Sequence, residues 1–416
     1  MVKPFSRKLT DVMSEISNKY TGLILISGAD APGVTQALFE TLSPFSVSIL
    51  DMEQVIIRGR LILTTLIELH PDHQSAIEDD LMTLGRKLAM DIAVDFSTHD
   101  VVSRDDSSRL QLVVLAKRLY PKAIASVAAA INKHGGNVDR FRRTAAYPVT
   151  SIEFDVALPQ NQSVQALKND LAELALREGI TLSIEAGGLA RRSKRIVLLD
   201  MDSTFIQQEV IDLLAEKAGV LEAVARITNA AMRGEVDFAK SLTDRVALLK
   251  GLSENVFKEV AEQLVLTPGA RTLVRTLHRM GHKVGIVSGG FTNVIEPLIR
   301  NMKVDFFKAN TLEVVDGHLT GRVIGPIIDR PAKAQALKEF SEQESVPLSH
   351  AIAVGDGAND LDMIREAGLG IAFNAKPSVR TQADSALDLP YLDAILYLIG
   401  IPREEIEAAD KDLTNG

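Results

Sequence analysis

The chain of 416 residues contains no cysteine. Disulfide bonds, thiolate catalysis and cysteine-ligated metals are therefore excluded, and the composition is compatible with a reducing compartment. The eight histidines are scattered along the chain and form neither an HExxH motif nor an evident zinc cluster. Any metal site should therefore depend on oxygen ligands.

The chain also lacks an excess of positive charge. It has 46 Lys and Arg against 55 Asp and Glu, a formal net charge of -9 and a pI near 5.5. A general nucleic-acid binder needs a basic surface that displaces the counterions of the phosphates. We therefore expect no nucleic-acid partner, and the acidic balance fits poorly with docking on anionic lipid.

Long apolar runs are missing as well. No run approaches the length that spans a bilayer, and the first twenty residues lack the apolar core of a signal peptide. The composition, with 46% hydrophobic and 24% charged residues, is that of an ordinary globular protein. We expect a soluble cytoplasmic enzyme of two to four domains, without a membrane partner.

The first half of the chain contains a tandem repeat. Residues 20–97 show the order strand, helix, strand, strand, helix, strand, and residues 109–186 show it again. The period is roughly 85–90 residues, and the order is that of a split βαβ unit. The polar stretch Thr98–Ser108 lies between the copies as a linker. The sequence therefore predicts two ferredoxin-like α+β domains.

A second linker follows the repeats, at residues 187–194, and it carries the basic residues Arg191, Arg192 and Lys194, with Arg195 next to it. Basic clusters of this size can mark a nucleic-acid patch. In an acidic protein we interpret it as a solvated linker.

The second half, residues 194–400, has a different pattern. Short apolar runs typical of parallel strands buried on both faces alternate with helical segments, at Ile196–Leu199, Val284–Val287, Ala351–Val354 and Gly370–Phe373. This order predicts a doubly wound α/β domain. A mostly helical segment at about 208–265 is predicted to be an inserted cap, and Asp316-Gly317 within Thr311–Val323 indicates a hairpin.

Polar residues follow the predicted strands. Asp200 and Asp202 end the first, Ser288-Gly289-Gly290 end the second, Lys333 begins a helix, and Asp356 to Asp360 follow the run at Ala351. Ligands bind open parallel sheets at the carboxyl ends of the strands. These side chains should therefore meet in one crevice. Each motif alone fits a surface turn, a helix cap or a solvated lysine, but the ordered set favours catalysis.

The expected chemistry follows from the carboxylates. Asp200, Asp202, Asp356 and Asp360 would repel one another unless a cation neutralised them. Oxygen ligation favours Mg²⁺, which binds through one or two carboxylates and a substrate phosphate. On an extended strand end, Asp200 and Asp202 should face the same way, so that one attacks phosphorus and the other moves protons.

These motifs resemble those of the haloacid dehalogenase (HAD) superfamily, and specifically the phosphoserine phosphatases. The residues that carry the resemblance are DMDST (200–204), Ser288-Gly289-Gly290-Phe291, Lys333 and GDGANDLDM (355–363). The resemblance implies that Asp200 is the nucleophile and Asp202 the proton donor and acceptor. It also implies Mg²⁺ ligation by Asp200, the Asp202 backbone carbonyl and Asp356. Phosphate contacts are implied for Ser288, Gly289, Lys333 and Asn359, and a supporting role for Asp360.

The cap carries the substrate prediction. The family uses a cap glutamate for the substrate amine and a cap arginine for its carboxylate, which here match Glu209 and Arg245. Met232 and Phe238 match cap residues that approach the substrate. Arginine grips a carboxylate with two hydrogen bonds. Taken singly, Glu209 fits an ordinary first-turn glutamate and Arg245 a surface ion pair; together they favour O-phospho-L-serine.

The two repeats resemble ACT domains, which often bind amino acids at their interfaces. The loop Gly28–Gly33 carries this resemblance, and Asp30 is expected to cap the following helix. The second repeat departs from the pattern, because Lys117–Pro121 lacks both the Asp and the Gly. The resemblance implies an amino-acid effector and a homodimer.

We therefore expect a phosphoserine phosphatase that acts in serine biosynthesis through an aspartyl-phosphate. One alternative is a HAD phosphatase or phosphotransferase that acts on another small phosphate. A sugar phosphate has neither an ammonium nor a carboxylate for the pair Glu209 and Arg245 to bind, so this pair argues against that alternative. The other is a non-catalytic amino-acid sensor, against which the complete set of Asp200, Asp202, Lys333 and Asp356 argues.

Overall fold

The structure, a computed structural model, describes residues 20–98, 109–187, 196–232 and 237–414. It separates into two compact units, Met1–Arg104 and Asp105–Gly416, each of which we describe by itself. The basic residues of the second linker, Arg191 to Arg195, lie outside the described residues.

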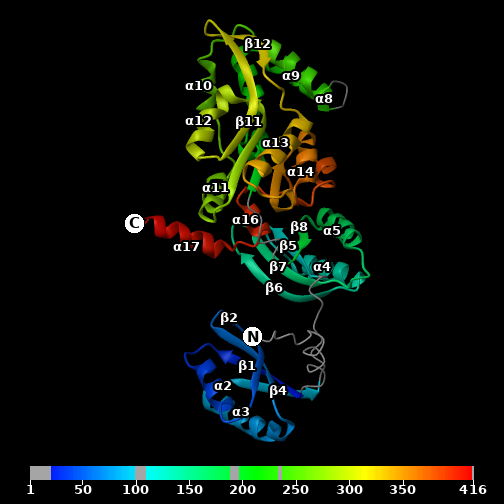
Figure 1. The fold of residues 1–416 in the computed structure, drawn as a ribbon, viewed down its shortest axis with the longest axis vertical. Helices are drawn as coiled ribbons and strands as arrows, with labels where there is room; N and C mark the ends of the chain where they lie inside the picture. The colour runs from blue at the N-terminus through cyan, green and yellow to red at the C-terminus, as the bar shows by residue number, and fades with distance from the viewer. Residues whose placement is uncertain (1–19, 99–108, 188–195, 233–236, 415–416) are drawn as a thin grey trace, which may run out of the picture. The chain divides into compact units, whose positions relative to one another are not determined.

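The first unit contains one four-stranded antiparallel sheet (Figure 1). Its elements follow the predicted order: β1 Tyr20–Ala29, α2 Val34–Leu42, β2 Ser48–Ile57, β3 Arg60–Glu68, α3 Gln74–Leu88 and β4 Asp91–Thr98. The strand order is β2-β3-β1-β4. Alternation in β1 buries Ile24 and Ile26 under the helices and exposes Leu23 and Leu25.

The expected helix cap at Asp30 is wrong. Helix α2 begins only after Gly33, which has a left-handed φ of 92° and provides no side-chain cap. Asp30 lies three residues earlier, and its backbone N–H donates to the Gly59 carbonyl at 2.8 Å. Glycine makes this turn possible because its lack of a Cβ removes the steric cost of a positive φ.

The second repeat begins the second unit. It comprises β5 Arg109–Ala116, α4 Pro121–Lys133, β6 Asn137–Ala145, β7 Thr150–Ala157, α5 Val164–Glu178 and β8 Thr181–Ala186. Ser163 caps α5 by accepting from the Ala166 N–H at 3.2 Å, and Gly179 ends it in the left-handed conformation. The strands pair in the order β8-β5-β7-β6.

The rest of the unit is built on parallel strands in the order β11-β10-β9-β13-β14-β15. The strands are β9 Ile196–Asp200, β10 Lys283–Phe291, β11 Phe306–Val315, β13 Ala351–Gly355, β14 Leu369–Phe373 and β15 Ser385–Leu387, with β12 His318–Ile324 antiparallel at the edge. Both faces of β9 are covered: Val197 and Leu199 enter one core, whereas Ile196 and Leu198 enter another. This is the predicted doubly wound layout.

Helices fill the two layers around this sheet (Figure 1). One core contains residues of α11 and α12, and the other contains residues of α13. The helices outside the cap are α11 Ala270–Arg279, α12 Thr292–Met302, α13 Arg330–Gln343, α14 Leu361–Glu366, α15 Pro377–Arg380, α16 Ala394–Leu398 and α17 Arg403–Thr414.

The sheet does not stop at β15. Strand β8 of the second repeat pairs with β15 antiparallel at Ser183 and Ser385, which produces one sheet of eleven strands. Val113, Leu115, Ala145 and Val149 of the repeat are buried in the same core as the parallel strands. The second repeat and the parallel sheet therefore form one folded body.

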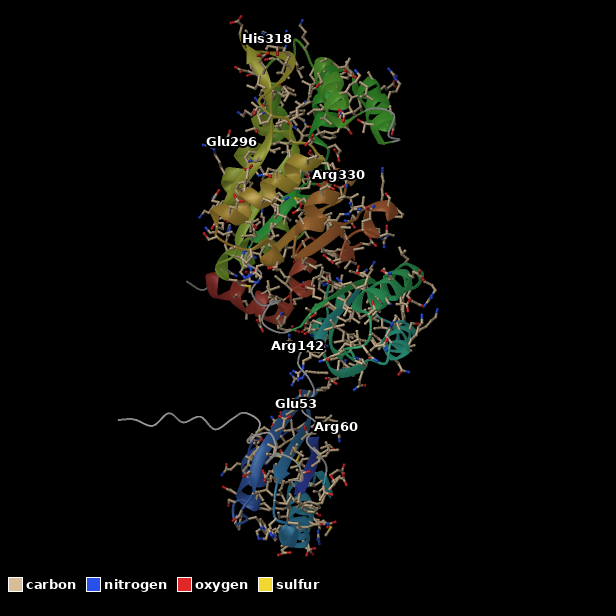
Figure 2. All side chains as sticks on the ribbon, turned by 45° about the vertical axis from the view of Figure 1, so that its right-hand side comes forward. Glu53, Arg60, Arg142, Glu296, His318 and Arg330 are labelled. Carbon is tan, nitrogen blue, oxygen red and sulfur yellow. The ribbon has the colours of Figure 1, made fainter. Side chains whose placement is uncertain are left out.

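Apart from residues 233–236, which the structure does not describe, the cap contains the helices α7 Val210–Ala218, α8 Leu221–Met232, α9 Phe238–Ala247 and α10 Val256–Ala261. Its base is tied by the Gln207 N–H to the Val265 carbonyl at 2.9 Å. Its far end is tied to the β11–β12 hairpin, where the Gly251 N–H donates to the Leu319 carbonyl at 2.8 Å. His318 marks the tip of this hairpin (Figure 2).

None of the helices in the described ranges is long and apolar enough to span a bilayer.

Candidate active site

The site begins at the end of β9. Asp200 is the last residue of the strand and only 4% exposed. Strand β9 ends at Asp200, although Asp202 itself has extended backbone dihedral angles. Residues Met201–Phe205 form a tight turn in which Asp202 has φ -68° and ψ 136° and Ser203 has a left-handed φ of 54°. The chain turns here because its next segment enters the cap.

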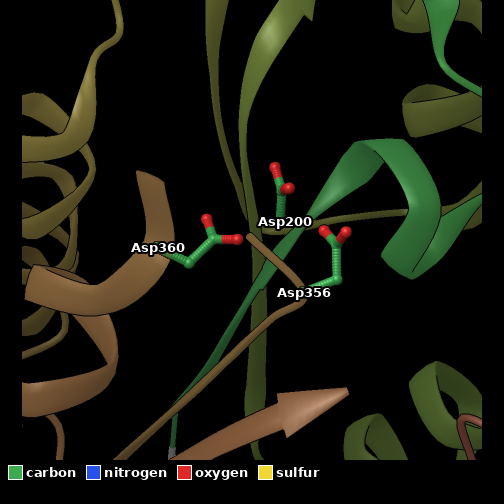
Figure 3. A group of neighbouring side chains, drawn as sticks. All are labelled: Asp200, Asp356 and Asp360. Carbon is green, nitrogen blue, oxygen red and sulfur yellow. The ribbon is translucent and has the colours of Figure 1, made fainter. Parts of the chain in front are cut away.

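Three carboxylates from two strand ends share one space. One oxygen from each of Asp200, Asp356 and Asp360 lies within 4.8 Å of the others, and Figure 3 shows the three carboxylates converging. Asp356 follows β13, the neighbour of β9 in the sheet. The prediction that these distant segments meet at the carboxyl edge is confirmed for these three residues.

Lys333 lies fully buried against this cluster. Its Nζ donates to Asp200 Oδ1 and to Asp360 Oδ1, both at 2.7 Å. It stands in the first turn of α13, where Asp329 caps the helix by accepting from the Ala332 N–H at 3.0 Å. The helix is also linked to α14 by an ion pair between Arg330 and Asp362, and Figure 2 labels Arg330.

The electrostatics follow from burial and crowding of like charges. Burial and the neighbouring Asp360 raise the pKa of Asp200 well above its usual range, against the pull of Lys333. Burial and Asp360 raise the pKa of Asp356 to about 7. For Lys333, burial lowers the pKa, but Asp200 and Asp360 outweigh burial and raise it. One ammonium does not neutralise this cluster, which therefore favours a bound cation.

The turn at Ser288, near the end of β10, packs closely against Asp202. Ser288 is fully buried, and its Oγ accepts from the Gly290 N–H at 2.8 Å. A Cβ at Gly290 would lie 2.8 Å from Asp202 Oδ2, so only glycine leaves room for that carboxylate. The Gly289 carbonyl accepts from Asn310 Nδ2 at 2.8 Å, which fixes the turn from β11.

The segment after β13 is equally crowded. Asp360 is fully buried and accepts from Lys333 through Oδ1 and from the Gly357 N–H through Oδ2 at 3.0 Å. A Cβ at Gly355 would meet the Asp360 side chain at 2.3 Å. Asn359 lies in the same turn and is partly exposed. Both oxygens of Asp360 are thus engaged with the protein.

Asp202 and Glu209 lie where the turn meets the cap. Asp202 Oδ1 accepts from the Val210 N–H at 3.1 Å, at the first residue of α7. Burial and the charge of Glu209 raise the pKa of Asp202 to about 7, although the Val210 N–H opposes this shift. Glu209 Oε1 accepts from Ser203 Oγ at 2.7 Å.

Arg245 faces these acids from α9. Burial lowers its pKa, whereas Glu209, Asp212 and Asp202 oppose that shift, so the guanidinium lies within their field. Its Nε donates to the Ser241 carbonyl at 3.2 Å and its Nη1 to Thr228 Oγ1 at 3.4 Å. Within the described ranges Arg245 forms no ion pair, which leaves it available to an anionic ligand.

Two further cap residues were predicted to approach a substrate. Phe238 lies over the Ser288 turn: a Cβ at Gly289 would be 3.3 Å from its Cζ. Met232 ends α8, but its side chain lies outside the described residues.

Sequence reasoning assigned no role to Ser203 or Asn310. Ser203 is part of DMDST, so its contact with Glu209 was open to prediction from the motif. Asn310 is 1% exposed and holds both the Gly289 carbonyl and the Ile328 N–H, the latter at 2.9 Å. Only its polar character within a strand signalled a role.

Three family models match the chain. Residues 197–365 match the haloacid dehalogenase-like hydrolases, and residues 21–95 and 108–185 each match an ACT domain. The fold and site thus define a HAD-type hydrolase preceded by two ACT domains.

Curated relatives narrow this class. Phosphoserine phosphatase SerB2 of Mycobacterium tuberculosis is 48% identical over 394 residues, which cover 94% of this chain and 96% of the relative. The phosphoserine phosphatase of Streptomyces coelicolor is 47% identical over 95% of this chain and 96% of its own length. The chain belongs to the phosphoserine phosphatase family.

Solved structures agree on the fold. A HAD family hydrolase of Salmonella enterica serovar Typhi superposes with a TM-score of 0.61 and 28% identity, covering 70% of this chain and 99% of that one. The unliganded probable phosphoserine phosphatase of Vibrio cholerae gives a TM-score of 0.55 and 31% identity over 72% and 88% of the two chains.

Proposed function

We propose that this protein hydrolyses O-phospho-L-serine to L-serine and phosphate through an aspartyl-phosphate at Asp200, as the last step of serine biosynthesis. The observation that carries the proposal is the pair of opposite charges in the cap. Glu209 accepts from Ser203 in the turn that follows Asp200. Arg245 on α9 forms no ion pair within the described ranges, and the charge of Glu209 acts on its pKa. The two opposite charges match the ammonium and carboxylate of an amino acid.

In the first step an Asp200 oxygen attacks phosphorus in line, and the bond from phosphorus to the serine oxygen breaks. Lys333 holds Asp200 Oδ1, which fixes the carboxylate and leaves its second oxygen for attack. Asp202 gives its proton to the departing serine oxygen. Ser288, Gly289, Lys333 and Asn359 contact the phosphoryl oxygens, whose charge must be stabilised in the transition state.

In the second step water attacks the aspartyl-phosphate. Asp202 removes a proton from this water as the water oxygen bonds to phosphorus. The bond from phosphorus to the Asp200 oxygen breaks, phosphate leaves and the Asp200 carboxylate is regenerated. A group with a pKa near the working pH serves best as both acid and base. The pKa of about 7 for Asp202 supports both roles.

The carboxylates fit a hard divalent cation, and we propose Mg²⁺. Asp200, Asp356 and the backbone carbonyl of Asp202 would hold it, with oxygen ligands of the kind it prefers. When bound, the ion neutralises the carboxylates and stabilises charge on the phosphoryl group. Asp360 has both oxygens engaged with Lys333 and Gly357, so we propose that it supports the site without ligating the ion.

A panel of phosphate esters tests the substrate. Phosphoserine should be hydrolysed far faster than 3-phosphoglycerate, which has a hydroxyl in place of the ammonium, and phosphoethanolamine, which lacks the carboxylate. Activity should disappear with EDTA and return with Mg²⁺. Equal rates on all three esters would overturn the substrate assignment and favour a general small-molecule phosphatase. Absence of turnover on any ester would favour the sensor.

We further propose that an amino acid, most simply serine, regulates the enzyme at the ACT repeats. The first repeat supports this with an open loop: a Cβ at Gly33 would meet nothing within 4 Å. The test is serine inhibition of the full chain and of Gly33→Ala, with Gly281→Ala as a control for the strain of a left-handed alanine. Loss of a non-competitive component only in Gly33→Ala supports regulation. Purely competitive inhibition in all three would contradict it.

We also propose a cytoplasmic homodimer. The edge strand β2 supports self-association, because Ile49, Ile56 and Ile57 are each at least half exposed (51%, 50% and 61%). Light scattering of the purified chain tests the dimer, and a monomer at micromolar concentration would contradict it. Cell fractionation tests the location, and enzyme recovered outside the cytoplasmic fraction would contradict it.

A further inference from the structure

The carboxylate of Glu209 is held by one residue of the turn Met201–Phe205, which follows Asp200. Ser203 Oγ donates to Glu209 Oε1 at 2.7 Å, across six residues of sequence. In the ranges that the structure describes, no other hydrogen bond or ion pair is formed by this carboxylate. Glu209 itself is solvent-exposed, so without the serine hydroxyl its side chain would sample several rotamers.

The backbone of Ser203 is shaped for this contact. Its φ of 54° lies in the left-handed region, which costs a residue with a Cβ roughly 1–2 kcal/mol. The Ser203 N–H donates to the Gln208 carbonyl at 3.2 Å, and this bond closes the loop so that residue 209 returns to the serine. A glycine would adopt the same turn without strain, but it would have no hydroxyl.

Adjacent residues of the turn hold adjacent residues of the cap. Asp202 accepts from the Val210 N–H at 3.1 Å, and Ser203 donates to the Glu209 carboxylate at 2.7 Å. The orientation of Glu209 is thereby fixed relative to Asp202. An ammonium bound by Glu209 therefore has a fixed position relative to Asp202, the proposed proton donor.

We infer that Ser203 is a positioning residue that selects for a substrate ammonium by orienting the carboxylate of Glu209. Its hydroxyl occupies one lone pair of Oε1 and leaves the other oxygen of Glu209 to accept from the ammonium. Binding then requires less ordering of the Glu209 side chain. Ser203 acts through Glu209, and it does not itself contact the reacting atoms.

This inference rests on the proposed function, because it concerns the ammonium of phosphoserine. The experiment measures kcat and KM for phosphoserine and for 3-phosphoglycerate, in the full-length enzyme with Mg²⁺. The proteins are the wild type, Ser203→Ala, Ser203→Gly, Glu209→Ala and the two double variants. Turnover of an aryl phosphate confirms that each variant is folded.

Ser203→Ala removes the hydroxyl and keeps the backbone strain, whereas Ser203→Gly removes both. We expect each to lower the selectivity for phosphoserine over 3-phosphoglycerate about tenfold, mainly through KM, since hydrogen bonds to charged groups are among the stronger ones. In the Glu209→Ala background, either change at Ser203 should leave the selectivity where Glu209→Ala alone puts it.

Three results would overturn the inference: unchanged selectivity in both serine variants, wild-type selectivity in Ser203→Gly alone, or a full further loss in the Glu209→Ala background. The second would assign the effect to backbone strain and the third to an action independent of Glu209. Failure of the proposed function itself would be seen separately, as a wild-type enzyme that does not hydrolyse phosphoserine.

Discussion

Single buried charges determine the geometry of this site. Lys333 has no exposed surface, and its ammonium donates hydrogen bonds to Asp200 and Asp360 with two of its three N–H groups. Removal of one partner from such a buried network costs several kcal/mol, because the remaining charges stay unpaired. The network therefore holds Asp200 in place before a substrate arrives, as its proposed role as nucleophile requires.

Arg245→Ala should reduce kcat/KM for phosphoserine far more than for an aryl phosphate, which has no carboxylate. Loss of a charge-assisted bidentate contact costs on the order of 2–4 kcal/mol, or roughly 30- to 1000-fold. Lys240→Ala is the matched control, because this residue lies on the same helix and pairs with Asp244 at the surface at 2.9 Å. Equal losses on both substrates in Arg245→Ala would mean that the arginine serves the fold.

The convergence of Asp200, Asp356 and Asp360 was predictable from the sequence, because these residues follow recognisable buried strands. The turn at Asp202 and Ser203 was not. A left-handed serine has no reliable sequence signal, since the conformation is imposed by the return of the chain to the cap. The role of Asn310 was equally unpredictable, because its two hydrogen-bond partners lie 18 and 21 positions away in the sequence.

At the scale of elements, the hairpin of β11 and β12 positions the cap. The Leu319 N–H donates to the Leu252 carbonyl at 2.9 Å, and the Glu254 N–H donates to the Gly317 carbonyl at 2.9 Å. Gly321 in β12 approaches α9 so closely that a Cβ would lie 3.2 Å from the Ala247 carbonyl. The hairpin therefore restrains α9, the helix that carries Arg245.

Gly321→Ala should raise KM for phosphoserine several-fold and lower the free energy of unfolding by about 1–2 kcal/mol, since the new Cβ adds a contact with α9 to the strain of a positive φ. Gly325→Ala is the matched control: its φ of 80° is similar to the 82° of Gly321, but a Cβ there meets nothing within 4 Å. Both should lose stability in thermal melts. A similar KM in the two variants would contradict the positioning role.

The order of strands and helices was predictable because turn residues and buried runs mark it. The pairing of β8 with β15 was not, because β15 has only three residues and offers no pattern. Likewise, Val113 and Leu115 have the alternation of any strand covered on one face, and only the fold shows that their side enters the core of the parallel sheet.

At the scale of the molecule, the second ACT repeat is part of the catalytic body. A chain without residues 1–104 should fold and remain active. A chain without residues 1–194 should lose on the order of 4 kcal/mol or more of stability, because it exposes the core contacts of Val113, Leu115, Ala145 and Val149. Urea melts of the two chains test this. Equal stabilities would show that the second repeat is an independent domain.

The buried carboxylates also link metal binding to pH. In the metal-free protein the pKa values of Asp202 and Asp356 are raised to about 7, against about 3.9 in an unfolded chain. Between these pKa values the native state binds more protons than the unfolded state does. Protonation of the two carboxylates therefore stabilises the native state at low pH, and this stabilisation is lost as the pH rises through the folded pKa.

A bound cation removes this penalty, so Mg²⁺ should raise the melting temperature more at about pH 8 than at about pH 6. Differential scanning fluorimetry with and without Mg²⁺ measures both shifts. In Asp356→Asn, which lacks one of the carboxylates, Mg²⁺ should raise the melting temperature at about pH 8 less than it does in the wild type. A larger stabilisation at the lower pH in the wild type would contradict the proposed metal site.

We propose that the phosphoryl group is transferred to Asp200 before water releases it. The most direct measurement mixes the enzyme with phosphoserine and Mg²⁺, quenches it in acid during turnover and locates the phosphoryl group by mass spectrometry. We expect it on the peptide that contains Asp200, labile to hydroxylamine, and we expect neither adduct nor turnover in a folded Asp200→Asn enzyme. Rapid turnover by Asp200→Asn, or a phosphoryl group on another residue, would contradict a nucleophilic role for Asp200.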